Sequence, residues 1–169
     1  ASLTLSPSIV SPGDTITCTA TASDSYGGSG TTTITIVIVN TGPEITTVTT
    51  SPSSGITTST TVVCAAEASD DDGEAPTLSY AWTNESGETL GTAASLTLSP
   101  SIVSPGESLT CTATATDSSG DSSSTTIVIV IINTDPVITT VTTSPSSDVT
   151  TTTTVVCAAE ASDDDLDDV

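Results

Sequence analysis

The chain contains an internal repeat with a period of 93 residues. The stretch ASLTLSPSIVSPG at 1–13 recurs unchanged at 94–106. Residues 1–76 and 94–169 are identical at 57 of 76 positions, in one register without a gap. Chance similarity between two Thr-rich segments would not hold one register over that length. The sequence therefore predicts a tandem array of one structural unit.

Proline-containing segments mark the expected boundaries between repeats. NTGP at 40–43 and NTDP at 133–136 each follow an apolar run, as interdomain linkers commonly do. Cutting there gives a complete repeat at 43–135, with the end of a preceding repeat at 1–42 and the start of a following one at 136–169. The chain has no Met and no signal peptide, which is typical of an internal or processed segment.

Alternation of residue types predicts strands throughout. The chain is rich in Thr, Val and Ile, which favour strands, whereas the strong helix formers are scarce or absent. In 107–116, for example, Leu109, Cys111, Ala113 and Ala115 share one face and Thr residues the other. Within the complete repeat we expect strands at 44–50, 58–68, 77–83, 94–99, 107–116 and 125–132. The expected fold class is all-β.

The charge of the chain excludes several classes of function. It carries 21 Asp and Glu but no Lys, Arg or His, so the formal net charge is −21. Without cations it cannot neutralise nucleic-acid phosphates, and an anionic membrane surface would repel it. No apolar run is long enough for a membrane span within this segment. A conventional base for a Ser or Cys nucleophile is also missing, so we do not expect an enzyme.

Cysteine content and the resemblance of the strands point to a specific fold. Four Cys in an acidic, Ser/Thr-rich chain suggest disulfides and an oxidising compartment. Cys64, Trp82 and Cys111 follow one another at spacings of 18 and 29 residues, the order found in immunoglobulin domains. The phrases VVCAAEASDDDGEAPTLSYAW and SPGESLTCTATATDSSGD resemble the tandem immunoglobulin-like and polycystin-type (PKD) repeats of large bacterial surface or filament proteins.

The resemblance implies immunoglobulin-like β-sandwich repeats. Cys64 and Cys111 would form the disulfide, with Trp82 and Tyr80 in the core. Residues 1–42 would supply the last three strands of one sandwich and 136–169 the first two of another, so Cys18 and Cys157 would pair with neighbouring units or copies. The Tyr usual two residues before the second Cys is replaced by Leu109, which is unlike antibody-type domains.

An acidic loop after the second predicted strand is the strongest site signal. In an immunoglobulin-like sandwich this loop lies at the same end as the last hairpin turn, near linker residues Asn40, Thr41 and Glu44. Clustered carboxylates repel one another unless a cation intervenes, and Ca²⁺ prefers six to eight oxygen ligands. We expect either a Ca²⁺ ion that stiffens the domain junction or a solvated acidic turn. The candidate ligands are Asp70, Asp71, Asp72, Glu74, Asp117 and Asp121.

Thr and Ser occupy positions where exposed strands usually carry charge. The chain holds 39 Thr and 28 Ser. Dense O-glycosylation would make such a surface soluble, whereas the plainer interpretation is a simple preference of Thr for strands. Asn84-Glu85-Ser86 is the only sequon for N-glycosylation. The candidate glycan sites are Asn84, Thr110, Thr112, Thr114, Thr151 and Thr152.

The strand predicted at 125–132 is apolar on both faces. Its residues 127–132 show no alternation, whereas a sandwich strand normally presents one face to water. The face of Val128, Val130 and Ile132 is the expected outer one, because the first copy has Thr35 at the position of Val128. This face is either a lateral assembly contact or an exposed product of β propensity.

These features together predict a structural component of an extracellular filament, stalk or surface layer. Near-identical repeats place one surface at regular intervals, which suits a head-to-tail or helical polymer of copies of the chain. The expected partners are those copies and covalent glycans, and the location is secreted or cell-surface. The alternative is an adhesin-type module that recognises glycans or a protein partner, although three aromatic residues offer little surface for stacking on sugars.

Overall fold

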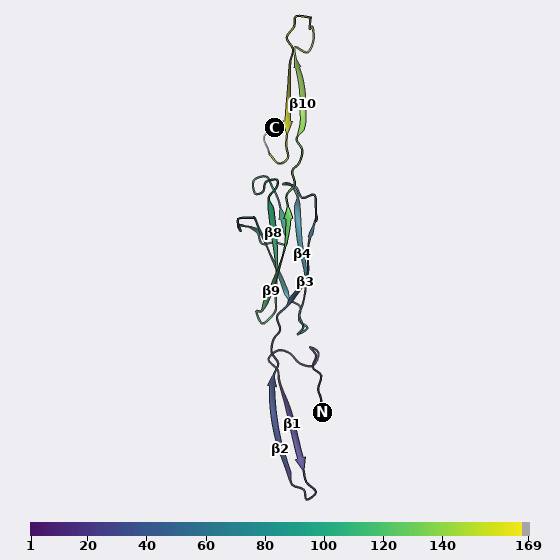
Figure 1. The fold of residues 1–169 in the computed structure, drawn as a ribbon, viewed down its shortest axis with the longest axis vertical. Coiled ribbons are helices and arrows are strands. Elements are labelled where there is room, and N and C mark those ends of the chain that lie inside the picture. Colours follow the sequence, from purple (N-terminus) through teal and green to yellow (C-terminus); the bar gives the residue numbers. More distant parts are fainter. Residues whose placement is uncertain (167–169) are drawn as a thin grey trace. The chain divides into compact units, whose positions relative to one another are not determined.

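The computed structural model describes residues 1–166 and contains only strands, turns and loops (Figure 1). Its strands form two two-stranded sheets, β1–β2 and β10–β11, a three-stranded sheet β3–β4–β7 and a four-stranded sheet β6–β5–β8–β9. The pairings β1–β2, β10–β11, β4–β7 and β5–β6 are antiparallel. The strand bounds are β1 Thr15–Ser23, β2 Ser29–Val37, β3 Glu44–Ser51, β4 Thr61–Ser69, β5 Thr77–Thr83, β6 Thr89–Gly91, β7 Ser95–Thr97, β8 Ser108–Thr116, β9 Ser122–Val130, β10 Val137–Ser144 and β11 Val156–Ser162.

The all-β prediction is confirmed, and most predicted strands lie where alternation placed them. β5 has the predicted bounds, and β3 and β8 differ from prediction by one residue. β4 begins three residues late, because Thr57–Thr60 form a turn closed by the Thr60 N–H on the Thr57 carbonyl at 3.1 Å. β9 begins three residues early, because the turn before it is already closed by the Asp117 N–H on the Asp121 carbonyl. β6 was not predicted, and the strand predicted at 94–99 is shortened to the three residues of β7.

The chain divides into two compact units. Unit 1 comprises Ala1–Thr47, Ala66–Leu78 and Thr114–Thr125, and unit 2 comprises Val48–Ala65, Ser79–Ala113 and Thr126–Val169. This division differs from the repeat boundaries at 43 and 136, which remain a prediction from the sequence.

The hydrophobic core lies in unit 2 and draws side chains from two sheets. β8 alternates strictly, with Leu109 and Cys111 fully buried and the intervening Thr side chains half-buried. The remaining core residues are Ile56, Val62, Cys64, Trp82, Leu96, Leu98, Val103, Ile129 and Ile131. The core therefore joins the sheet that contains β4 to the sheet that contains β8.

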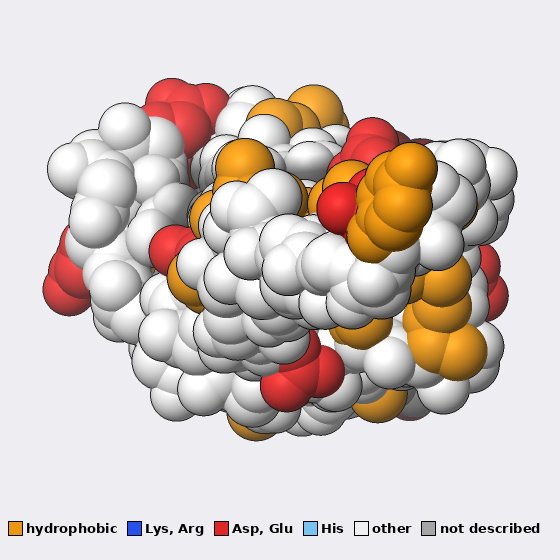
Figure 2. Space-filling view, turned by 90° about the horizontal axis from the view of Figure 1, so that it is seen from below, with side chains coloured by type: hydrophobic (Ala, Val, Ile, Leu, Met, Phe, Trp, Pro, Cys, Tyr) orange, Lys and Arg blue, Asp and Glu red, His pale blue; other side chains and the backbone are white. Residues whose placement is uncertain are grey.

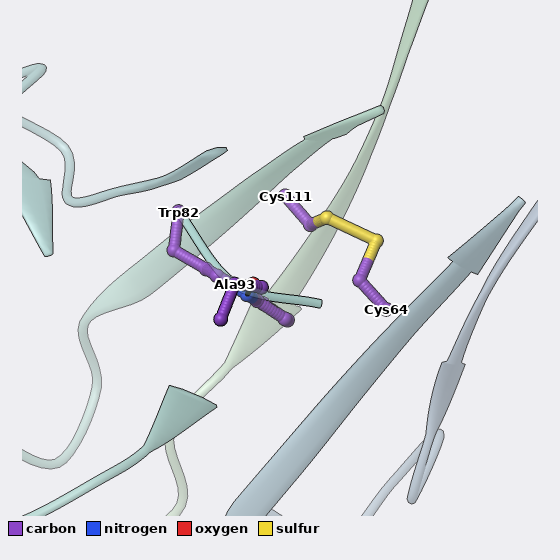
Figure 3. Close-up of a disulfide and its surroundings, with 4 residues drawn as sticks. All are labelled: Cys64, Trp82, Ala93 and Cys111. Carbon is purple, nitrogen blue, oxygen red and sulfur yellow. Dashed lines mark hydrogen bonds between the residues drawn. A yellow bond between two sulfur atoms is a disulfide. The ribbon is translucent and has the colours of Figure 1, made fainter. Parts of the chain in front are cut away.

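A disulfide between Cys64 and Cys111 crosses this core, as predicted (Figure 3). The two Cα atoms are 6.6 Å apart, and both Cys side chains are buried. Trp82 beside it is fully buried, and its indole N–H donates to the Ala93 carbonyl at 3.2 Å. This bond satisfies the one polar group of the ring, so the indole can lie in an apolar core without an unmet hydrogen bond.

The two-stranded hairpins expose the residue types that the core buries. β1–β2 corresponds in sequence to β8–β9, and β10–β11 to β3–β4. Ile36 of β2 is 54% exposed, whereas its counterpart Ile129 is 5% exposed. Hydrophobic side chains also reach the surface among acidic ones on the face drawn in Figure 2. Each hairpin thus presents an open apolar face.

Candidate functional site

The candidate site is built on the loop that follows β4. Asp70 shapes this loop, because its Oδ1 accepts the Asp72 N–H at 2.8 Å and its carbonyl accepts the Gly73 N–H at 3.1 Å. Gly73 closes the turn with φ +82°, a conformation that favours glycine. The loop therefore projects its carboxylates from a hydrogen-bonded turn.

The turn between β8 and β9 lies against this loop within unit 1. Ser118 donates both its backbone N–H and its hydroxyl to the Glu74 carboxylate, at 3.1 and 2.6 Å. Asp117 next to it is buried, and its Oδ1 accepts the Asp121 N–H at 2.8 Å. Ser118 and Glu74 are 44 residues apart in sequence, so these bonds hold together two loops that are distant along the chain.

Three carboxylates converge where these loops meet. One oxygen from each of Asp70, Glu74 and Asp117 lies within 4.8 Å of the other two. Asp70 Oδ2 is buried and has no hydrogen-bond partner among the described residues. Carboxylates this close repel one another, and oxygen donors of this kind are those that Ca²⁺ and Mg²⁺ prefer. This acidic group could hold a metal ion.

The other three predicted ligands have different surroundings. Asp72 and Asp121 bind linker residues, and Asp71 lines an apolar pocket in unit 1. The loop sequence DDD could not distinguish these roles, because adjacent residues in a tight turn point in different directions. Half of the predicted ligand set is thus brought together in one group.

Asn40 ties the linker to the turn between β8 and β9. Its side-chain amide donates to Asp117 Oδ2 at 2.8 Å and to Asp121 Oδ2 at 2.9 Å, while its Oδ1 accepts the Ser119 hydroxyl at 2.9 Å. The Asn40 hydrogen bond, helped by backbone N–H groups, holds the pKa of Asp117 below its ordinary value despite burial. Asn40 and Thr41 thus lie at the acidic loops, as predicted, whereas Glu44 begins β3.

A second contact fixes the linker and recurs in the repeat. The backbone N–H and hydroxyl of Thr41 both donate to Asp72 Oδ2, at 2.7 and 3.0 Å. In unit 2, Thr134 makes the same pair of bonds to Asp165 Oδ2, at 2.6 and 2.8 Å. Thr134 and Asp165 are the repeat counterparts of Thr41 and Asp72. We call this pair of bonds the Thr–Asp clamp.

Sequence reasoning missed the clamp and a buried threonine beside it. Thr58 has no exposed surface, and its hydroxyl donates to Asp165 Oδ1 at 2.6 Å. The bonds from Thr58 and Thr134 lower the pKa of Asp165. The only sequence signal was that the NT and DDD segments are identical in both copies.

The predicted glycan sites differ in accessibility. Asn84 is half-buried, and its amide group is engaged with Ser86 and Glu88. Thr110, Thr112 and Thr114 are half-buried on β8, and the Thr114 hydroxyl bonds that of Ser124 at 2.9 Å. Thr151 and Thr152 are exposed. Glycosylation at these residues stays a prediction.

The remaining predicted residues are exposed. Val128, Val130 and Ile132 are 57%, 54% and 47% exposed and face away from buried Ile129 and Ile131. Cys18 and Cys157 are exposed free thiols, whereas the counterpart pair Cys111 and Cys64 is bonded.

No known protein family, curated protein or solved structure matches this chain. Over the part of the chain that the structure describes, no helix is long and apolar enough to cross a membrane.

Proposed function

We propose that this chain is a structural component of an extracellular filament, stalk or surface layer built from tandem immunoglobulin-like sandwiches. The Thr–Asp clamp carries the proposal. A linker whose backbone N–H and Thr hydroxyl are both held by one carboxylate has fewer accessible conformations than a free one, so it sets a defined spacing between elements. A clamp repeated with the period of the sequence is what a regular fibre requires.

The sandwich interpretation rests on the core. Cys64 comes from the three-stranded sheet and Cys111 from the four-stranded sheet, and Trp82 packs in the same cluster. Two sheets that share one core and one cystine are the arrangement of immunoglobulin-like domains. A disulfide also suits an oxidising, extracellular location, where Thr-linked glycans would keep the Ser/Thr-rich surface soluble.

The adhesin-type alternative has less support. Sugar recognition commonly uses aromatic faces, and of the three aromatic residues Trp82 is buried, Tyr80 is partly buried and Tyr26 stands alone in an exposed turn. Electron microscopy of the native material distinguishes the two functions. Regular fibres with a constant axial repeat support the structural role, and isolated flexible rods favour the binding module.

We further propose that Asp70, Glu74 and Asp117 bind Ca²⁺ and stiffen the linker region. A cation would satisfy Asp70 Oδ2 and relieve the repulsion among the three carboxylates. Binding only the folded state raises the melting temperature as free Ca²⁺ increases. We expect chelator to lower the Tm of the wild type and to have no effect on Asp117→Asn.

Asp24→Asn is the matched control for the calcium experiment. Asp24 is the repeat counterpart of Asp117 and shapes the same kind of turn, accepting the Tyr26 and Gly28 N–H groups. It is not in the three-carboxylate group. A Tm that does not respond to Ca²⁺ in the wild type would rule out the metal while leaving the structural role intact.

A further inference from the structure

An open pocket in unit 1 has a filled counterpart in unit 2. The pocket has a volume of about 210 Å³. Its apolar wall is formed by Leu5, Val10 and Ile38, and Asp72 lies at its acidic side. Leu5 is 40% exposed there. Its remaining lining residues are Ser6, Pro7 and Asp71.

The counterpart residues in unit 2 are Leu98, Val103, Ile131 and Asp165. The three apolar residues belong to the core cluster that contains Ile56, and Leu98 is only 3% exposed. The segment 56–58 fills this place with the buried Ile56 side chain and two hydrogen bonds. Ile56 is 1% exposed, its carbonyl accepts the Ile132 N–H at 2.8 Å, and Thr58 bonds Asp165 Oδ1 at 2.6 Å.

The repeat supplies a second segment with the same chemistry. Residues 149–151 are the counterparts of 56–58, with Val149 in place of Ile56 and Thr151 in place of Thr58. Val149 is 55% exposed and Thr151 is also exposed. Val is smaller than Ile by one methylene, so Val149 can enter a space shaped for Ile without a clash. The chain thus contains one formed copy of this interface, between 56–58 and its pocket in unit 2. It also contains the two separate halves of a second copy: the unfilled pocket in unit 1 and the exposed segment 149–151.

We propose that the pocket receives Val149–Thr151 of a second copy of this chain. In this arrangement the Val149 carbonyl accepts the Val39 N–H, as the Ile56 carbonyl accepts the Ile132 N–H. The Thr151 hydroxyl donates to Asp72 Oδ1, as the Thr58 hydroxyl donates to Asp165 Oδ1. Asp72 then holds the linker with Oδ2 and the second copy with Oδ1. The inference rests on the proposed structural function, and it names the partner and the contact by which copies join head to tail.

The second copy is favoured over an unrelated partner by this internal precedent. The contact between 56–58 and its pocket is already formed within unit 2. The open pocket and the open segment are the repeat counterparts of its two sides, so a second copy can form the same contact again. An O-glycan on Thr151 would occupy the position that the second copy requires. The glycan prediction at Thr151 and this proposal therefore exclude each other.

Sedimentation velocity of the full chain tests the contact, with Cys18→Ser and Cys157→Ser in every variant so that no disulfide can form between copies while Cys64–Cys111 stays intact. Val10→Asp places a carboxylate in the pocket beside Asp71 and Asp72, and Val149→Asp places one on the inserting segment. We expect the wild type to associate with increasing concentration and each variant alone to remain monomeric. Mixed together they should form 1:1 dimers and nothing larger, because each supplies the intact half that the other lacks.

Thr152→Asp is the matched control, since the counterpart Ser59 is exposed and the substitution adds the same charge next to Thr151. It should associate within about twofold of the wild type. Native near-ultraviolet dichroism of Trp82 in each variant confirms that the core is intact. Association of Val149→Asp like the wild type, or a wild type that stays monomeric, overturns the inference. The proposed function is judged separately by microscopy of the native fibre, so the two can fail independently.

Discussion

Thr58 and Asp165 are 107 residues apart in sequence, and the Thr58 hydroxyl donates to Asp165 Oδ1 at 2.6 Å. Thr58 is completely buried and Asp165 is 6% exposed. The other oxygen of Asp165 accepts both bonds from Thr134. One carboxylate therefore satisfies three donors, and it fixes the start of the segment 134–136 to the turn that contains Thr58.

Thr58→Val should destabilise unit 2. The substitution keeps the shape of the side chain but removes the hydroxyl, so Asp165 Oδ1 loses its donor in a buried place. We expect the Tm to fall by about 4 °C, with Thr58→Ser retaining most of the stability. Differential scanning calorimetry measures the change.

Thr151→Val is the control for this experiment, because Thr151 is the exposed counterpart of Thr58. At concentrations where the chain is monomeric, it should leave the Tm nearly unchanged, as exposed substitutions usually do. Equal losses at both positions would show that the effect arises within the turn itself and not from the bond to Asp165.

The bond from Asn40 should control the ionisation of Asp117. Asn40→Ala removes the largest cause of the lowered pKa, so the pKa of Asp117 should rise toward or above its ordinary value of 3.8. Carbon-detected NMR titration of the carboxyl measures this shift directly.

The same bond gives stability a defined pH dependence. A carboxyl whose pKa is lower in the folded than in the unfolded state stabilises the fold above its unfolded pKa, and this contribution is lost as pH falls through the folded pKa. The Tm difference between the wild type and Asn40→Ala should therefore be constant above about pH 5 and shrink below about pH 4. A difference that grows on acidification would contradict this assignment.

Much of the core could be predicted because alternation states which side chains share a face. Leu109, Cys111, Ala113 and Ala115 were assigned inward from the sequence and are all buried. The disulfide and its indole neighbour were implied by the resemblance of the Cys64, Trp82 and Cys111 order to immunoglobulin domains, and both are present in the core.

The clamp and the pocket could not be predicted in the same way. The periodicity of residue types does not predict which loop contacts which linker. Asp71 and Asp72 are also the same residue type, so the sequence does not predict which of them binds Thr41. Thr58 was missed because Thr is common on exposed strands here, and its burial depends on a carboxylate that arrives from more than 100 residues away. Polar contacts at long sequence separation leave no local pattern.

The Cys64–Cys111 bond should supply a large share of the stability. It closes a loop over a sequence separation of 47 residues, which corresponds to roughly 4 kcal/mol of chain entropy. Cys64→Ala with Cys111→Ala should lower the free energy of unfolding by about that amount, measured by urea titration of Trp82 fluorescence. Cys18→Ser with Cys157→Ser, which removes exposed thiols, should change it by less than about 0.5 kcal/mol. Equal losses would contradict a structural role for the bond.

Cys18 and Cys157 should form a disulfide between copies if copies join through the pocket. Cys157 is the repeat counterpart of Cys64, and Cys18 is that of Cys111. If the segment 149–151 of one copy occupies the pocket of another copy as 56–58 occupy theirs, Cys157 of the first copy lies opposite Cys18 of the second, as Cys64 lies opposite Cys111. Glutathione disulfide is the oxidant. It accepts two electrons and two protons from the two thiols, and it leaves as two molecules of glutathione while one new S–S bond forms.

Single variants separate this directed pairing from random oxidation. A mixture of Cys18→Ser and Cys157→Ser retains one Cys157 and one Cys18 on different chains, so it should give at least tenfold more disulfide dimer than either variant alone on a non-reducing gel. Adding Val149→Asp to the chain that retains Cys157 should abolish this excess, because the insertion that aligns the thiols is lost. If each variant alone dimerises as readily as the mixture, the thiols meet by collision, and the alignment of β11 of one copy against β1 of the next is wrong.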